Sequence, residues 1–270
     1  GAGSTGVYTL SGGSLINNLH EYIGLAGAGT FNHSGGSNTV NSSATGFFTV
    51  GHNVGSTGTY NLSGTGVLTV ATPEYIGYGG AGTFSQTGGT NALLGSGGLY
   101  LGYSATGVGT YNLDGGTLSS EWDLQVGYAG TGFFNQSGGT HLPGASLIMG
   151  SQSQQSSGTY TLSGGTLDID FGDIIGLKGS GTFIHTGGFH TNDGFFSMGQ
   201  DAGSTGNYML SGTGVLSLHN FESIGIFGTA HFTQTGGINA ISSFYGITIA
   251  VNPGSVGSYT LTGGATTVGG

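Results

Sequence analysis

The sequence is most informative in what it lacks: cysteine, arginine and, apart from Lys178, any cationic side chain that is charged at neutral pH. The absence of cysteine excludes disulfides and thiolate chemistry. Eleven acidic residues against one lysine give a formal net charge of -10. Binding to a phosphate backbone requires lysines and arginines, so the composition argues against a nucleic-acid partner and disfavours anionic membrane surfaces.

Two further patterns are missing. The longest apolar runs are too short to span a membrane, so membrane insertion is not expected. The first residues show neither a charged segment nor an apolar segment after it, so we expect any signal peptide to have been removed or to lie outside this sequence. Apolar residues do not recur with helical spacing over even three turns, which predicts a protein without helices.

What the chain does contain is glycine and a repeated aromatic residue. It has 63 glycines, yet 35% of its residues are hydrophobic and 11% are aromatic, so it has enough apolar side chains for a core. Tyrosine and phenylalanine alternate along the whole chain at nearly regular intervals. The repeated positions are Tyr8, Phe31, Tyr60, Phe84, Tyr111, Phe134, Tyr160, Phe183, Tyr208, Phe232 and Tyr259. We call the two kinds of repeat Tyr-type and Phe-type.

Each repeat, such as "GTYNLSGTGVLTVATPEYIG", holds three short β-type runs separated by glycine turns. Three runs in roughly 25 residues suit one turn of a solenoid, which buries its apolar face only when turns stack. The sequence therefore predicts an all-β fold: one parallel β-solenoid (β-helix) domain over 1–270, with about 11 turns of two alternating types and the aromatics in a core column. A barrel or propeller is the weaker alternative, because a propeller blade needs about 40 residues.

Two positions separate the repeat types. Two residues after the aromatic, Tyr-type repeats have leucine, whereas Phe-type repeats have His33, Gln86, Gln136, His185 and Gln234. After the Gly-Gly turn, Phe-type repeats again have polar residues, namely Asn38, Asn91, His141, His190 and Asn239. We expect these pairs to satisfy each other and the turn backbone. A metal site is the alternative, and His185 with His190 is the one pair within a single turn that favours it.

An acidic residue precedes the last run of five Tyr-type repeats: Glu21, Glu74, Asp123, Asp173 and Glu222. We expect a solvated outer column of carboxylates. A column that binds calcium is the alternative, although the sequence has no EF-hand loop and no calcium-binding nonapeptide. We expect no other cofactor.

Catalysis is a third possibility, because paired carboxylates perform glycoside hydrolysis. Asp168 and Asp170 share a strand face in "LDIDFGD", and Asp173 follows. Against this, the sequence has no arginine and no long inserted loop to form a cleft. We therefore expect no catalytic residues and no enzyme activity.

The pattern "GTYNLSGG-x-L…(E/D)xIG-xx-G-x-GTFxQSGGTN" resembles the tandem β-strand repeats of large bacterial secreted and surface proteins, including autotransporter passengers and exosortase-anchored proteins. The resemblance covers all 270 residues and implies a passive extracellular role, secreted or at the cell surface. We expect a rigid rod that assembles end to end into a fibre or forms a stalk. The alternative is an adhesin, or a module that binds glycans or ice through its polar columns, with a cell-surface or matrix polysaccharide as partner.

Two expectations concern the surface and the ends. Asn32, Asn41, Asn61 and Asn135 lie in Asn-x-Ser sequons and are possible glycosylation sites. The chain opens and closes within Tyr-type repeats, so its end strands would either continue into a longer polypeptide or pair head to tail with another copy. Such a junction would stack Tyr259 on Tyr8 and should be the weakest seam.

Overall fold

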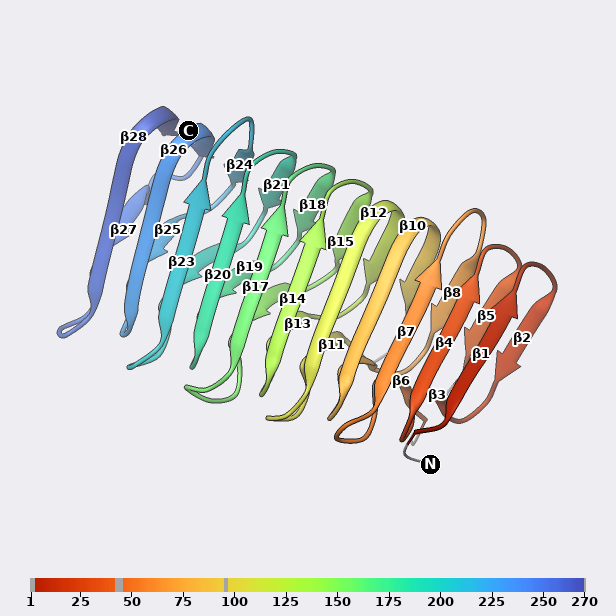
Figure 1. Cartoon of the computed structure of the whole chain (residues 1–270). Helices are drawn as coiled ribbons and strands as arrows, with labels where there is room; N and C mark the ends of the chain where they lie inside the picture. Colours follow the sequence, from red (N-terminus) through yellow and green to blue (C-terminus); the bar gives the residue numbers. More distant parts are fainter. Residues whose placement is uncertain (1–2, 42–45, 95–96, 270) are drawn as a thin grey trace.

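A computed structural model describes residues 3–41, 46–94 and 97–269. In this part of the chain every regular element is a β-strand, and all the strand pairs are parallel. The strands form an 18-stranded and a 10-stranded sheet, and the smaller sheet takes one strand from each described turn except the last (Figure 1). The predicted parallel β-solenoid is confirmed, and the barrel and propeller alternatives are wrong. No helix long and apolar enough to cross a membrane is found among the described residues.

Ten turns contain three β-runs, as predicted, and the last described turn contains only the first two. The first two runs belong to the larger sheet. The first runs are β1 (Thr5–Leu10), β4 (Ala28–His33), β7 (Thr57–Leu62), β14 (Thr131–Gln136), β17 (Ser157–Leu162), β20 (Ser180–His185) and β23 (Thr205–Leu210). The second runs are β2 (Ser14–Asn17), β5 (Ser37–Val40), β8 (Val67–Val70), β15 (Thr140–Pro143), β18 (Thr166–Ile169), β21 (Phe189–Asn192) and β24 (Val215–Leu218).

In four turns the first two runs join into one bent strand: β10 (Ala81–Leu93), β12 (Val108–Ser120), β26 (Thr229–Ile241) and β28 (Val256–Val268). The third runs make the smaller sheet: β3 (Glu21–Ile23), β6 (Phe48–Val50), β9 (Glu74–Ile76), β11 (Leu99–Leu101), β13 (Leu124–Val126), β16 (Ser146–Met149), β19 (Gly172–Ile175), β22 (Phe195–Met198), β25 (Glu222–Ile224) and β27 (Ile247–Ile249).

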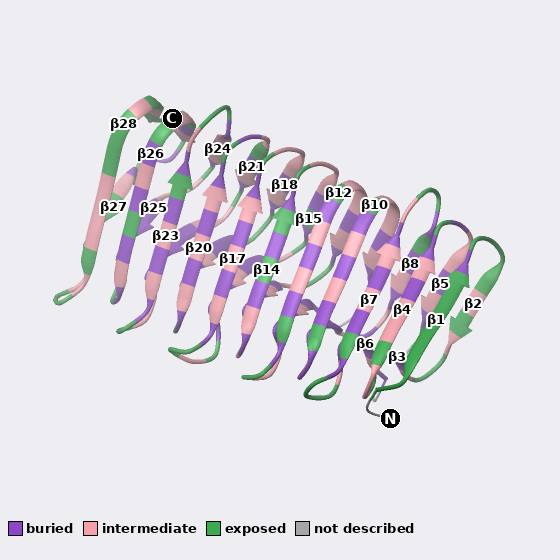
Figure 2. Cartoon of the chain, in the orientation of Figure 1, coloured by how far each residue is buried: buried purple, intermediate pink, exposed green. Residues whose placement is uncertain are grey.

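The repeated aromatics form the centre of the core. Alternation along the first run turns them inward, and the parallel register places each ring beside the next, for example Phe84 beside Tyr111. Along the column, neighbouring ring centroids lie between 4.6 and 5.0 Å apart. The predicted core column is therefore present. The rings of Phe134 and Tyr160 in the middle of the rod are completely buried, whereas Tyr8 in the first turn is 47% exposed. Figure 2 shows that most of β1 is exposed.

Glycine permits the corners between the sheets. A Cβ on Gly58 would lie 2.2 Å from the carbonyl oxygen of Ile23, so only glycine fits where the first run meets the third run of an earlier turn. Gly77 adopts a φ of 72° and also touches backbone of a neighbouring turn. The high glycine content thus reflects close backbone approach at the corners rather than disorder.

Candidate functional site, a repeated polar network in the core

The two polar side chains of each Phe-type turn meet at the hydroxyl group of the next tyrosine. The first polar position lies 2.5 to 2.9 Å from that hydroxyl in the pairs His33 with Tyr60, Gln86 with Tyr111, Gln136 with Tyr160, His185 with Tyr208 and Gln234 with Tyr259. The second position lies 3.1 to 3.3 Å from the same hydroxyl, in the order Asn38, Asn91, His141, His190 and Asn239. The predicted pairing is thus made through the tyrosine.

The chemistry of the groups fixes the direction of these hydrogen bonds. Gln86 Oε1 has no proton, so the Tyr111 hydroxyl donates to it. Gln86 Nε2 donates to the turn carbonyl of Gly89 and to the carbonyl of Thr117 in the next turn. Asn91 Nδ2 then donates to the Tyr111 oxygen at 3.3 Å. Each such tyrosine therefore donates to the first polar residue and accepts from the second, which explains why phenylalanine does not occupy these positions.

The acidic residues are placed differently from the prediction. Glu74, Asp173 and Glu222 are completely buried, and Glu21 is 8% exposed. The prediction of a solvated outer column was wrong. The acidic residue is the first or second residue of a very short third strand, and it faces the core on the same side as the last residue of that strand. The prediction also placed Asp123 in this column, but the equivalent core position beside Leu99 belongs to the next residue, Leu124.

Asparagine supplies the partner of each buried glutamate. The amide Nδ2 of Asn38 donates to Glu21 at 2.9 Å, and that of Asn239 donates to Glu222 at 3.0 Å. Asn91 Nδ2 lies 3.1 Å from Glu74 Oε2. In all three pairs the asparagine follows the glutamate by 17 residues. This constant spacing was the sequence signal that could have placed the acids in the core.

Burial changes the protonation of these carboxyl groups. Loss of hydration raises the pKa of Glu21 and Glu222 to about 7 and that of Glu74 to about 8, and the hydrogen bonds from asparagine only partly oppose the shift. One oxygen of Glu21 and the amide oxygen of Asn38 have no hydrogen-bond partner within the described part of the chain. A neutral carboxylic acid supplies a donor in this region, whereas a carboxylate adds only acceptors.

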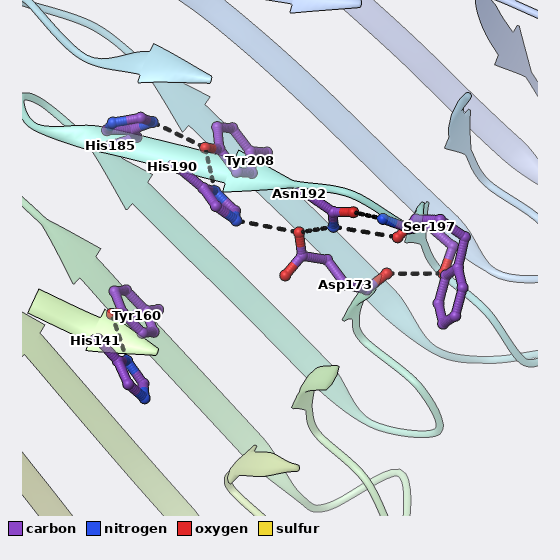
Figure 3. A network of polar contacts seen from close by, with 10 residues as sticks. His141, Tyr160, Asp173, His185, His190, Asn192, Ser197 and Tyr208 are labelled. Carbon is purple, nitrogen blue, oxygen red and sulfur yellow. Dashed lines mark hydrogen bonds and ion pairs between the residues drawn. The ribbon is translucent and has the colours of Figure 1, made fainter. Parts of the chain in front are cut away.

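A histidine replaces the asparagine in the turn that follows Asp173 (Figure 3). His190 Nε2 lies 3.1 Å from Asp173 Oδ2, and His190 Nδ1 lies 3.1 Å from the Tyr208 hydroxyl. Asn192 Nδ2 also donates to Asp173, and Ser197 Oγ donates to the Asp173 backbone carbonyl at 3.1 Å. Asp173, His190 and Tyr208 therefore form a group of contacting ionisable side chains in the described core.

Hydrogen-bond partners fix the role of Nδ1 in each of the two histidines. His185 Nε2 lies 3.3 Å from the Gly188 carbonyl, so it carries the proton and Nδ1 accepts from Tyr208. His190 Nδ1 must then donate to the Tyr208 oxygen. His190 Nε2 faces Asp173 Oδ2 at 3.1 Å but makes no hydrogen bond within the described residues. Burial lowers the pKa of His185 to about 3, which keeps this ring neutral at physiological pH.

His141 shows what happens where the acid is missing. His141 follows Leu124 by 17 residues, which is the spacing between Glu74 and Asn91. Its ring stacks on Phe134 with a centroid distance of 4.8 Å. Its Nδ1 donates to the Tyr160 oxygen, because the Tyr160 proton is already donated to a glutamine of the same Phe-type turn. Burial lowers the pKa of His141 to about 3. The neutral ring fits an apolar neighbour at a position where asparagine would have no carboxyl partner.

The geometry bears directly on metal binding and catalysis. His185 and His190 both direct Nδ1 at the Tyr208 hydroxyl rather than at a common point between them. In the described ranges no three His, Cys, Asp or Glu side chains are arranged to hold a metal ion. Asp168 and Asp170 do share one outward face, but Asp173 lies inside the core, so the three acids do not form one site.

The sequon asparagines lie on the outside of the rod. Asn32, Asn61 and Asn135 belong to one outward column of the larger sheet. Asn61 Nδ2 donates to Asn32 Oδ1 at 2.8 Å, and Asn135 Nδ2 donates to Asn112 Oδ1 at 2.9 Å. Asn41 is exposed just after β5, and the rest of its sequon falls in 42–45, outside the described residues.

One surface feature had no counterpart in the sequence predictions. Tyr78, Tyr103 and Tyr128 lie two residues after β9, β11 and β13 and stack on one another with centroid distances of 4.8 Å. Tyr75 and Tyr100 pack edge-on against them. We call these five residues the outer tyrosine ladder. These residues do not occupy the repeated aromatic position, and they occur in only a few turns. The repeat period of the sequence therefore did not indicate the ladder.

Comparison of the chain with protein-family models, with curated proteins and with solved structures found no match.

Proposed function

We propose that this protein is a structural extracellular rod that extends a fibre or a surface stalk by stacking at its ends. The observation that carries the proposal is the aromatic column, which runs through all the described turns and whose polar neighbours bond to the tyrosine hydroxyls inside the core. Asp173, His185 and His190 are 0% exposed, so the most reactive cluster has no surface for a substrate. The resemblance to bacterial surface repeats favours an extracellular location.

The outermost described strands carry apolar side chains that fit a further stacked strand. Val7 on β1 is 73% exposed, and Leu261 and Val268 on β28 are 50% and 52% exposed. Leu261 and Val268 continue rows of side chains that are buried in the middle of the rod. Apolar strand edges of this kind favour pairing with another strand. Head-to-tail pairing does not close on itself and therefore gives a filament.

Electron microscopy of the purified chain tests the proposal. We expect filaments with an axial repeat of roughly 50 Å, the length of ten to eleven turns stacked at the strand spacing. Val256→Asp places a charge on the exposed edge strand β28 and should shorten the filaments. Phe171→Asp, on a side of the rod where the ring is 69% exposed, is the matched control and should leave them unchanged. Monomers alone at high concentration, by microscopy and by solution scattering, would contradict the proposal.

A glycan-binding adhesin is the second candidate, and the outer tyrosine ladder is the observation that favours it. Tyrosine gives a rigid surface with an apolar body and a polar tip, and it is enriched where proteins bind partners. We expect Tyr103→Ala to abolish retention of the protein on an insoluble neutral polysaccharide, if this is its role. Exposed Phe171→Ala is the control. Ice binding fits less well, because the outward neighbours of the core aromatics vary, from Thr59 and Asn61 to Asn207 and Met209.

A further inference from the structure

One short strand joins the outer tyrosine ladder to a buried acid. In β9 the side chain of Glu74 lies in the core and is 0% exposed, whereas the next residue, Tyr75, lies on the opposite face of the strand and belongs to the ladder. The centroid of the Tyr75 ring lies 4.6 Å from that of Tyr103 and 5.3 Å from those of Tyr78 and Tyr100. A shift of β9 therefore moves a ring that contacts most of the ladder.

The immediate surroundings of Glu74 suit a neutral carboxylic acid. Its neighbours in the adjacent strands of the smaller sheet are Phe48 and Leu99, which are both apolar. Asn91 Nδ2, from β10, donates to the carboxyl group at 3.1 Å, and Asn91 Oδ1 has no hydrogen-bond partner among the described residues. A proton on Glu74 removes the charge and adds a donor to a pair of groups that otherwise has too many acceptors.

The ionisable groups around Glu74 offer no compensation for a negative charge. They are the phenols of Tyr60 in β7 and Tyr111 in β12 and the carboxyl group of Glu21 in β3. Burial raises the pKa of both phenols, so they stay neutral, and an ionised Glu21 repels a second carboxylate. An ionised Glu74 is therefore an unpaired charge in the core, and water reaches it only if the structure opens locally.

We propose that Glu74 is a proton switch for the outer tyrosine ladder: β9 and Tyr75 keep their places while Glu74 is protonated and leave them when it ionises. The strand β9 has three residues, so its opening breaks few contacts compared with unfolding of the whole rod. This inference rests on the proposed glycan-binding role of the ladder and adds the regulation of that site. The ladder binds at neutral and acidic pH and releases its ligand at alkaline pH.

The chain contains an internal control for the switch. Strand β13 is as short as β9, and it has Leu124 at the core position and Gln125 at the outward position. It also precedes a ladder residue, Tyr128, by two positions. Because β13 has no acid in the core, its protection should not depend on the ionisation of Glu74.

Backbone hydrogen exchange of the full chain tests the switch directly. It is measured by mass spectrometry at pH 6.5 and 9 and corrected for the intrinsic effect of pH on exchange. We expect β9 to lose protection at pH 9, whereas β13 keeps it. In Glu74→Gln the protection of β9 should be the same at both pH values. Asp170→Asn, which removes an exposed charge, should behave as the unaltered chain does.

Binding to insoluble cellulose, a neutral polysaccharide, gives the second measurement. If only the form with protonated Glu74 binds, the affinity should fall about fivefold between pH 8 and 9, since burial raises the pKa of Glu74 to about 8. In Glu74→Gln the affinity should stay constant. Burial raises the pKa of Tyr75 and Tyr100, so ionisation of these two ladder phenols does not cause such a fall.

Equal protection of β9 at pH 6.5 and 9 would overturn the switch. A loss of protection that persists in Glu74→Gln would also overturn it, because another group would then be responsible. An unchanged affinity for cellulose between pH 8 and 9 would show that the ladder does not respond to Glu74. Failure to bind cellulose at any pH would contradict the glycan-binding role alone, since hydrogen exchange still decides whether Glu74 controls β9.

Discussion

Stability should fall as the pH rises, chiefly because of Glu74. Its folded pKa of about 8 lies above the ordinary value of 4.5. Between these values the folded protein holds a proton that the unfolded chain releases, so raising the pH favours unfolding. Below pH 4.5 both states are protonated, and above about pH 8 both are ionised, so the contribution of Glu74 is level outside this window. The full shift corresponds to about 5 kcal/mol.

Substitution isolates this effect from other titrations. His141 and His185 have lowered pKa values, so their contribution to stability increases with pH up to about their ordinary value of 6.5 and opposes the glutamates. The comparison is therefore between variants at the same pH. Glu74→Gln keeps a neutral side chain of the same shape that still accepts from Asn91. At pH 8 it should be more stable than the unaltered chain by about 3 to 5 kcal/mol, and at pH 4.5 the two should be nearly equal.

Guanidinium chloride denaturation at pH 4.5, 6.5 and 8 measures these differences. Asp170→Asn removes one exposed negative charge just after β18 and is the matched control. It should change stability by less than about 0.5 kcal/mol at every pH. The reasoning is refuted if the unaltered chain becomes more stable between pH 6.5 and 8, or if Glu74→Gln has the same pH dependence as the unaltered chain.

Three further predictions concern the column and the surface. Phe134→Ala should cost about 3 to 5 kcal/mol, because the ring is 0% exposed between two stacked neighbours, and an unchanged melting temperature would contradict its burial. Phe84→Tyr should cost about 1 to 3 kcal/mol, since the preceding turn offers Leu62, which cannot accept from the new hydroxyl. Calorimetry measures this cost beside that of Tyr111→Phe, which leaves Gln86 Oε1 without its donor. Asn135 is the exposed sequon asparagine of the outward column, and its glycosylation should raise the intact mass above the 26.7 kDa of the sequence. An intact mass equal to 26.7 kDa would contradict glycosylation.

The sequence predicted the fold because one aromatic position repeats through the whole chain. Alternation within "TYNLS" was enough to turn Tyr60 inward, and the glycines indicated the turns. The polar residues near the core were also predicted, since they replace leucine at fixed positions. What escaped prediction was their common partner, because the tyrosine hydroxyl belongs to the following turn, far along the sequence, and its direction depends on the stacking.

The acidic residues were misplaced for a different physical reason. Carboxylates are rarely buried, so an outer column was the reasonable expectation for Glu21 and Glu74. The short third strand offers too few residues to show which side faces inward. Asp123 also seemed to belong to a regular column of acids in the sequence. It lies one residue before Leu124, which occupies the core position in that turn. The constant spacing between each buried glutamate and its asparagine resolves the ambiguity.

The alternation of hydroxyl-bearing and plain rings also bears on how such a gene lengthens or shortens. Loss of a single turn would bring two tyrosines or two phenylalanines together and leave either a hydroxyl without an acceptor or a glutamine without a donor. Loss or duplication of two adjacent turns restores the alternation, so that each tyrosine hydroxyl again follows a Phe-type turn. Recombination between copies is therefore tolerated in steps of one Tyr-type and one Phe-type turn together, and rods of different length should differ by even numbers of turns.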